Sequence, residues 1–105
     1  MAKAIIKVDV RARTSLFEVL QAEHEQRRTY GELAFSLCID NKKRNICYVI
    51  LEWISLRSLH RFLESPEAKE MIRNWPTVET IEVLELYDMT EDINKNTDAT
   101  ISNPA

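Results

Sequence analysis

Near the start of the chain, charged side chains alternate with apolar ones. Within residues 4–12, Lys7, Asp9 and Arg11 share one side of an extended backbone, and the other side is apolar. Buried charges need partners, so these three residues line solvent, an ion-pair network or a pocket. One interpretation is an ion-pair ladder at an interface. The other is a site in which Lys7 or Arg11 holds an anionic or enolic substrate and Asp9 acts as the base.

The two histidines of the chain, His24 and His60, both lie within predicted helices. An imidazole has a pKa of ~6.5 and is a common general acid or base, so both are candidate catalytic residues. The alternative is that each one is a helix residue hydrogen-bonded to a neighbour. Two histidines without a matching cluster of cysteines or carboxylates predict no metal site.

Four aromatic side chains are candidates for the lining of a pocket, because ligand pockets are mostly apolar with few polar groups. They are Tyr48, Trp53, Phe62 and Trp75. Together with Lys7 and Arg11 they make up the predicted substrate-binding set. The alternative is a place in the hydrophobic core, where large aromatic side chains are usually found.

The two cysteines, Cys38 and Cys47, flank a predicted hairpin turn. A turn centred on Lys42 and Lys43 would place them opposite each other on neighbouring strands. A redox switch is one hypothesis, and a pair of buried thiols in a reducing compartment is the other.

Residue patterns predict the elements that must position these side chains. A capping-box sequence at Ser15 predicts a helix over 15–28. Ser55 can cap a second helix, and Pro66 interrupts it near Ser65 because proline is tolerated only at a helix start. The further short helix ends near Trp75. Alternating or β-branched runs predict strands over 4–12, 32–39, 46–53 and 78–87.

This β-α-β-β-α-β order predicts an α+β, ferredoxin-like fold, in which two helices cover one face of a four-stranded antiparallel sheet. Residues 1–88 form the predicted domain, and residues 89–105 form a polar tail that we expect to be disordered. Residues 46–53 and 78–87 are apolar on both sides, so the uncovered face of the sheet would expose apolar surface. A homodimer that packs sheet face against sheet face is the expected solution.

Composition limits the classes of function. The 105 residues include one glycine, Gly31, which excludes glycine-rich phosphate loops. The net charge of −3 argues against nucleic acid as a partner. No apolar run approaches the ~20 residues that a membrane span needs, and the charged N-terminal segment does not resemble a signal peptide. We therefore expect a cytoplasmic protein without a membrane partner.

Two segments resemble a known superfamily. Residues 31–37, and more closely Glu52–Glu67 with its Glu-Trp-x-Ser and Ser-Pro pairs, are similar to the antibiotic biosynthesis monooxygenase-like branch of the dimeric α+β barrel superfamily. The resemblance covers residues 3–88. It implies a homodimer whose sheets form a shared barrel, with a pocket between sheet and helices in each subunit.

Members of this superfamily include cofactor-independent oxygenases of quinol-like aromatics, haem-degrading oxygenases, isomerases and proteins without known activity. Lys7 and Asp9 on the first strand, Phe62, and Ile72 depart from the pattern of the haem-degrading branch. The resemblance thus implies a cofactor-independent monooxygenase that acts on a small planar aromatic or enolic compound. The alternative is a non-catalytic dimeric module that binds a small apolar or aromatic ligand on the same scaffold.

Overall fold

The computed structural model describes residues 1–87. Their helices and strands follow the predicted order, with the second helical region split in two. The elements are β1 (Ala2–Val10), α1 (Arg13–Arg28), β2 (Glu32–Ile39), β3 (Ile46–Trp53), α2 (Leu56–Glu64), α3 (Pro66–Asn74) and β4 (Thr77–Tyr87). The predicted tail, 89–105, and the end of the predicted domain at residue 88 lie outside the described residues.

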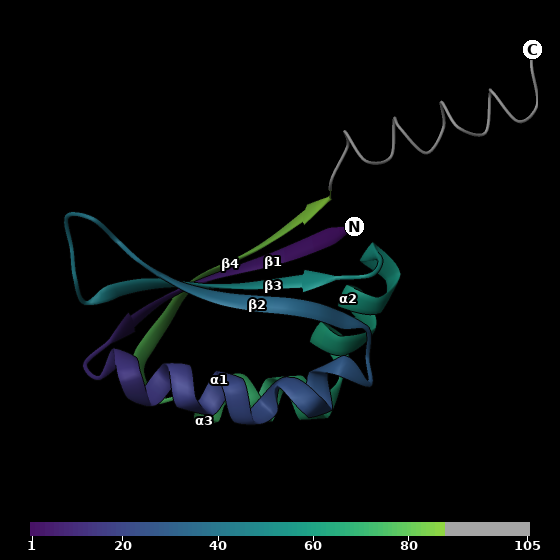
Figure 1. The fold of residues 1–105 in the computed structure, drawn as a ribbon, viewed down its shortest axis with the longest axis horizontal. Coiled ribbons are helices and arrows are strands. Elements are labelled where there is room, and N and C mark those ends of the chain that lie inside the picture. Colours follow the sequence, from purple (N-terminus) through teal and green to yellow (C-terminus); the bar gives the residue numbers. More distant parts are fainter. Residues whose placement is uncertain (88–105) are drawn as a thin grey trace, which may run out of the picture.

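The four strands form one antiparallel sheet in the order β2-β3-β1-β4. The helices gather on one side of this sheet (Figure 1). The α+β, ferredoxin-like architecture predicted from the sequence is therefore confirmed.

Strand β1 shows how the sequence divides the two faces of the sheet. Every second residue from Ala2 to Val10 is at most 2% exposed and faces the helices. Leu16 and Leu20 from α1 and Phe62 from α2 complete this core with the buried residues of β3. Burial of apolar side chains on this face is what holds the helices to the sheet.

Ser65 divides the second helical region as predicted. Its hydroxyl accepts the Ala68 N–H (3.1 Å) at the start of α3 and donates to the Phe62 carbonyl (2.6 Å) at the end of α2. Pro66 follows as the first residue of α3, where its missing N–H breaks no helical hydrogen bond. One serine thus ends one helix and begins the next.

The predicted start of the first helix was wrong. Helix α1 begins at Arg13, with Ala12 at the cap position and no side-chain cap, so Ser15 lies inside the first turn. Burial of Leu16 and Leu20 against the sheet stabilises the helix without the cap.

The predicted register of the hairpin was also wrong, by one residue. Cys38 pairs with Tyr48, and Ile39 pairs with Cys47. The Asp40 carboxylate accepts the N–H groups of Lys42 (2.8 Å) and Lys43 (2.9 Å), which fixes a longer turn and lowers the pKa of Asp40. A shift of one residue moves a side chain to the other face, so Cys38 is exposed and Cys47 is buried.

The sheet face opposite the helices carries an apolar row across three strands. Ile50, Ile5 and Leu84 are cross-strand neighbours on β3, β1 and β4. Strand β4 forms one edge of the sheet and is uncovered on both sides, with Val83 44% and Leu84 41% exposed. Within residues 1–87, no helix or loop covers this apolar surface.

Candidate functional site

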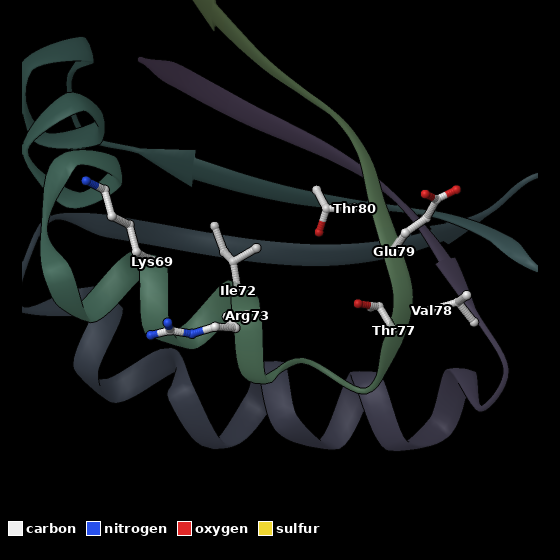
Figure 2. A pocket seen from close by; sticks show the side chains of 7 residues that line it. All are labelled: Lys69, Ile72, Arg73, Thr77, Val78, Glu79 and Thr80. Atoms are coloured by element: carbon white, nitrogen blue, oxygen red, sulfur yellow. The ribbon is translucent and has the colours of Figure 1, made fainter.

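A groove separates α3 from the first half of β4 (Figure 2). It has a volume of about 450 Å³. Its walls are Lys69, Ile72 and Arg73 from α3 and Thr77, Val78, Glu79 and Thr80 from β4. In Figure 2 the side chains of Thr77 and Thr80 point toward α3, whereas Val78 points to the opposite side of the strand.

A tight connection brings these two walls together. Helix α3 ends at Asn74, and the Thr77 N–H donates to the Trp75 carbonyl over 2.7 Å. The indole N–H of Trp75 donates to Glu23 on α1 (3.0 Å) and holds the turn against the helix layer. The last turns of α3 therefore stay beside the start of β4.

The chemistry of the groove suits an anionic or enolic molecule with an apolar body. Lys69 and Arg73 supply two positive charges against the single negative charge of Glu79. Thr77 and Thr80 supply hydroxyl groups, and Ile72 supplies apolar surface. The volume lies within the roughly 300–1,000 Å³ typical of small-molecule sites. A second hollow of about 320 Å³, lined by Arg11, Pro76, Thr77 and Val78, adjoins the groove at Thr77 and Val78.

The structure places three predicted residues together on the face opposite the helices. Lys7 lies beside Tyr48, with its Nζ 6.0 Å from the ring centroid. Asp9 accepts a hydrogen bond from the Asn45 side chain over 3.2 Å. These residues line neither the groove nor the adjoining hollow, whereas Arg11 lines the hollow.

Both histidines already have carboxylate partners. His24 Nδ1 lies 2.6 Å from Glu32 Oε1, and His60 Nε2 lies 3.0 Å from Glu85 Oε1. His60 and Glu85 line a separate hollow of about 320 Å³ with Leu63 and Glu64. The structure therefore brings neither imidazole to the groove.

Three of the predicted aromatic residues are part of the packed interior. Trp53 and Phe62 are at most 1% exposed, and their ring centroids lie 4.9 Å apart. Trp75 is 4% exposed and lies behind the turn that leads to β4. None of the three lines the groove between α3 and β4.

A buried charged network was missed by the sequence analysis. Arg27 is fully buried and donates to Glu32 (2.6 Å), to Glu23 (3.2 Å) and to the Leu20 carbonyl (2.7 Å). The helical spacing indicates that Arg27 is buried, because it lies on the same face of α1 as three residues before it. They are Leu16, Leu20 and Glu23. A charged residue that continues a buried stripe needs a buried partner.

Burial raises the pKa of the Glu23 carboxyl, against the lowering effects of its hydrogen bond to Trp75 and of the charge on Arg27. The network ties together α1, the first residue of β2 and the turn after α3. It stands outside the groove and supports one wall through Trp75.

Within residues 1–87, no group of three or more His, Cys, Asp or Glu side chains is arranged to hold a metal ion. Among the same residues, no helix has the length and apolar character needed to cross a bilayer.

Comparison with known proteins gives a likeness of fold. No protein-family model matches the sequence, and no curated protein matches it. A solved structure from Bordetella bronchiseptica, provisionally named an antibiotic biosynthesis monooxygenase, has a TM-score of 0.68 and 11% identity, and the match covers 84% of this chain and 96% of that one.

Two further structures with the same provisional name agree with this match. The protein from Deinococcus radiodurans has a TM-score of 0.60 and 16% identity, with 83% of this chain and 91% of that chain covered. The protein from Chloroflexus aurantiacus has a TM-score of 0.61 and 18% identity, with 84% and 92% covered. The chain therefore has the antibiotic biosynthesis monooxygenase-like fold that the resemblance predicted.

Proposed function

We propose that the protein is a cytoplasmic homodimer that holds a small planar aromatic or enolic compound in the groove between α3 and β4 and oxygenates it without a cofactor. The observation that carries this proposal is the groove itself. Its lining combines Lys69 and Arg73 from α3 with Thr77 and Thr80 from β4, on a fold shared with solved structures provisionally named as monooxygenases.

The chemistry required of the protein is modest. A methylene group next to a carbonyl loses a proton to give an enolate, and the carbanion adds dioxygen. The hydroperoxide then loses water, so that CH₂ and O₂ become C=O and H₂O with no outside reductant. Lys69 and Arg73 would stabilise the enolate oxygen, because nearby positive charge favours an anion and lowers the pKa of the bound enol.

The same geometry supports a second candidate, a module that binds its ligand without turning it over. The groove contains no histidine, and Glu79 is its one carboxylate. The other candidate bases, Asp9, His24 and His60, are all engaged elsewhere. A module that only binds its ligand would need the positively charged side chains of the groove but no catalytic base.

Anthrone is a suitable probe, because its methylene is acidic and its enolate is aromatic. Oxygen uptake and anthraquinone formation would be followed with the wild type, with Arg73→Gln and with Arg57→Gln, the control at an exposed position outside the groove. If the protein is an oxygenase, oxygen uptake should saturate with anthrone and give one anthraquinone per O₂. The rate of uptake should be at least tenfold lower in Arg73→Gln and unchanged in Arg57→Gln. Saturable binding without uptake would support the module, and the absence of both would refute a site in this groove.

The homodimer is proposed from the uncovered apolar row formed by Ile50, Ile5 and Leu84. Pairing these faces would remove apolar surface from water on both subunits. Sedimentation should give about twice the 12.3 kDa chain mass. Leu84→Glu should give the monomer, whereas Ile54→Glu, which alters an exposed side chain in the loop after β3, should not. A wild type that sediments as a monomer at micromolar concentration would contradict the dimer.

A further inference from the structure

Another cavity lies where β1 ends, α1 begins and the hairpin turn approaches them. Its volume is about 540 Å³. It is lined by Asp9, Val10, Arg11, Arg13, Arg44, Asn45 and Val78. Two arginines from the junction of β1 and α1 and one from the hairpin turn thus converge on one hollow, together with a single carboxylate.

A backbone contact positions the turn at this cavity. The Val10 N–H donates to the Asn45 carbonyl over 2.7 Å, and the Asn45 side chain donates to Asp9 over 3.2 Å. Asn45 is thus fixed to the end of β1, and Arg44 is its immediate neighbour in the chain. The turn that carries Arg44 is therefore held at the end of β1.

Within the part of the chain that the structure describes, these three arginines have no acidic ion-pair partner. Among residues 1–87, neither Arg11 nor Arg13 nor Arg44 takes part in an ion pair. The Nη1 atom of Arg13 is buried and has no hydrogen-bond partner within the same residues. A buried donor without an acceptor is unfavourable and uncommon, so the Arg13 guanidinium keeps an unused hydrogen-bonding group next to the cavity that Arg13 lines.

The surrounding charge points to an anion. The lining contains three arginines and one aspartate, so its net charge is +2. The net charge of the whole chain is −3. Guanidinium groups bind phosphate and carboxylate oxygens with paired hydrogen bonds. The first turn of α1, which starts at Arg13, contains no acidic residue and has no side-chain cap, so nothing there repels an anion.

We propose that this cavity binds the phosphate group of a small molecule through Arg11, Arg13 and Arg44. The cavity has more volume than a single phosphate needs, so the rest of a small phosphate ester can occupy it. This site is separate from the proposed oxygenation in the groove between α3 and β4. The two cavities share Val78 but none of these arginines.

Titrations followed by amide resonances test the proposal with the complete chain. Inorganic phosphate and glycerol 3-phosphate would each be added at constant ionic strength, with sodium chloride as the reference salt. We expect saturable shifts centred on residues 13–15 and 44–45. Tighter binding of the ester would identify a phosphorylated metabolite as the ligand, and equal binding would identify free phosphate.

Two variants in the site and one control complete the experiment. Arg13→Gln and Arg44→Gln should each weaken phosphate binding at least tenfold, whereas Arg57→Gln, at an exposed position of α2, should leave it unchanged. Arg44 lies in an exposed turn, so its replacement tests the site without a large effect on folding. Shifts no larger than those caused by chloride, or equal weakening by Arg57→Gln, would overturn the proposal. Anthrone binding in Arg13→Gln should match the wild type, which separates this result from any failure of the proposed function.

Discussion

Arg27 and Glu32 form a buried ion pair in which Arg27 Nε donates to Glu32 Oε2 over 2.6 Å and neither side chain is exposed. The pair joins the last turn of α1 to the first residue of β2 across the connection that contains Gly31. The Arg27 guanidinium also lies 5.2 Å from the centroid of the Phe35 ring. Both charges are thus satisfied within the helix–sheet layer, and each depends on the other.

Removal of one partner should therefore be costly. Arg27→Leu leaves the Glu32 carboxylate buried with only His24 beside it, and breaking a buried pair in this way costs about 3–5 kcal/mol. Urea denaturation at fixed protein concentration would measure the loss. Arg28→Gln breaks the exposed pair with Glu25 and should cost no more than about 1 kcal/mol. Equal losses in the two variants would show that burial of the pair has no energetic importance.

The stability contribution of Glu23 should depend on pH with a definite sign. Burial raises the pKa of Glu23 above its ordinary value of 4.5, so above pH 4.5 the folded protein retains a proton that the unfolded chain releases. The stabilisation from this group is complete below pH 4.5 and is lost as the pH rises through the raised pKa. Glu23→Gln keeps an acceptor for Trp75 without the titration. The free energy of unfolding of this variant, relative to wild type, should increase between pH 4 and pH 7.

Glu25→Gln is the control for that measurement, because Glu25 is exposed on the same helix. Its stability relative to wild type should change much less over the same pH range. A difference between Glu23→Gln and wild type that stays constant from pH 4 to pH 7 would contradict the assignment.

The elements of the fold could be predicted because their signals are local. The alternating residues of β1, the β-branched run of β3 and the Ser65-Pro66 step each determine structure within a few residues. The start of α1 was missed because Leu16 and Leu20 stabilise that helix by tertiary packing and not by a cap. The cysteine register was missed because it depends on the turn made by Asp40.

The site was much harder to predict because its walls have no common motif. Lys69 and Arg73 look like the solvated face of a short helix, and Thr77 and Thr80 look like ordinary strand residues. Only the tight turn at Trp75 brings the end of α3 beside the start of β4. Arg11 was singled out in the sequence and Arg13 follows it by two residues, but Arg44 joins them only through the contact between Val10 and Asn45.

Gly31 should not tolerate a side chain. Its φ of +115° is rarely adopted by other residues, and a Cβ atom there would lie 3.0 Å from Ile54 Cγ2 and from Ser58 Cβ. Gly31→Ala should therefore destabilise the protein by about 1–3 kcal/mol from backbone strain alone, with the close contacts adding to it. Urea denaturation would measure the effect. Ala34→Gly, in the neighbouring strand β2, is a control that leaves Gly31 unchanged, and a Gly31→Ala variant as stable as wild type would contradict the argument.

The two thiols should behave independently, because Cys38 and Cys47 lie on opposite faces of the sheet. Cys47 is fully buried, and burial raises the pKa of its thiol, so the reactive thiolate is scarce as well as inaccessible. A disulfide-forming reagent such as Ellman's should modify no more than one thiol per folded chain and both in denaturant. Cys38→Ser should abolish the rapid reaction, and Cys47→Ser should retain it.

Mild oxidation followed by mass spectrometry should reveal no loss of two hydrogens within one chain, because a disulfide between opposite faces would require the β2–β3 pairing to break. Detection of that intrachain disulfide in folded protein would disprove the register.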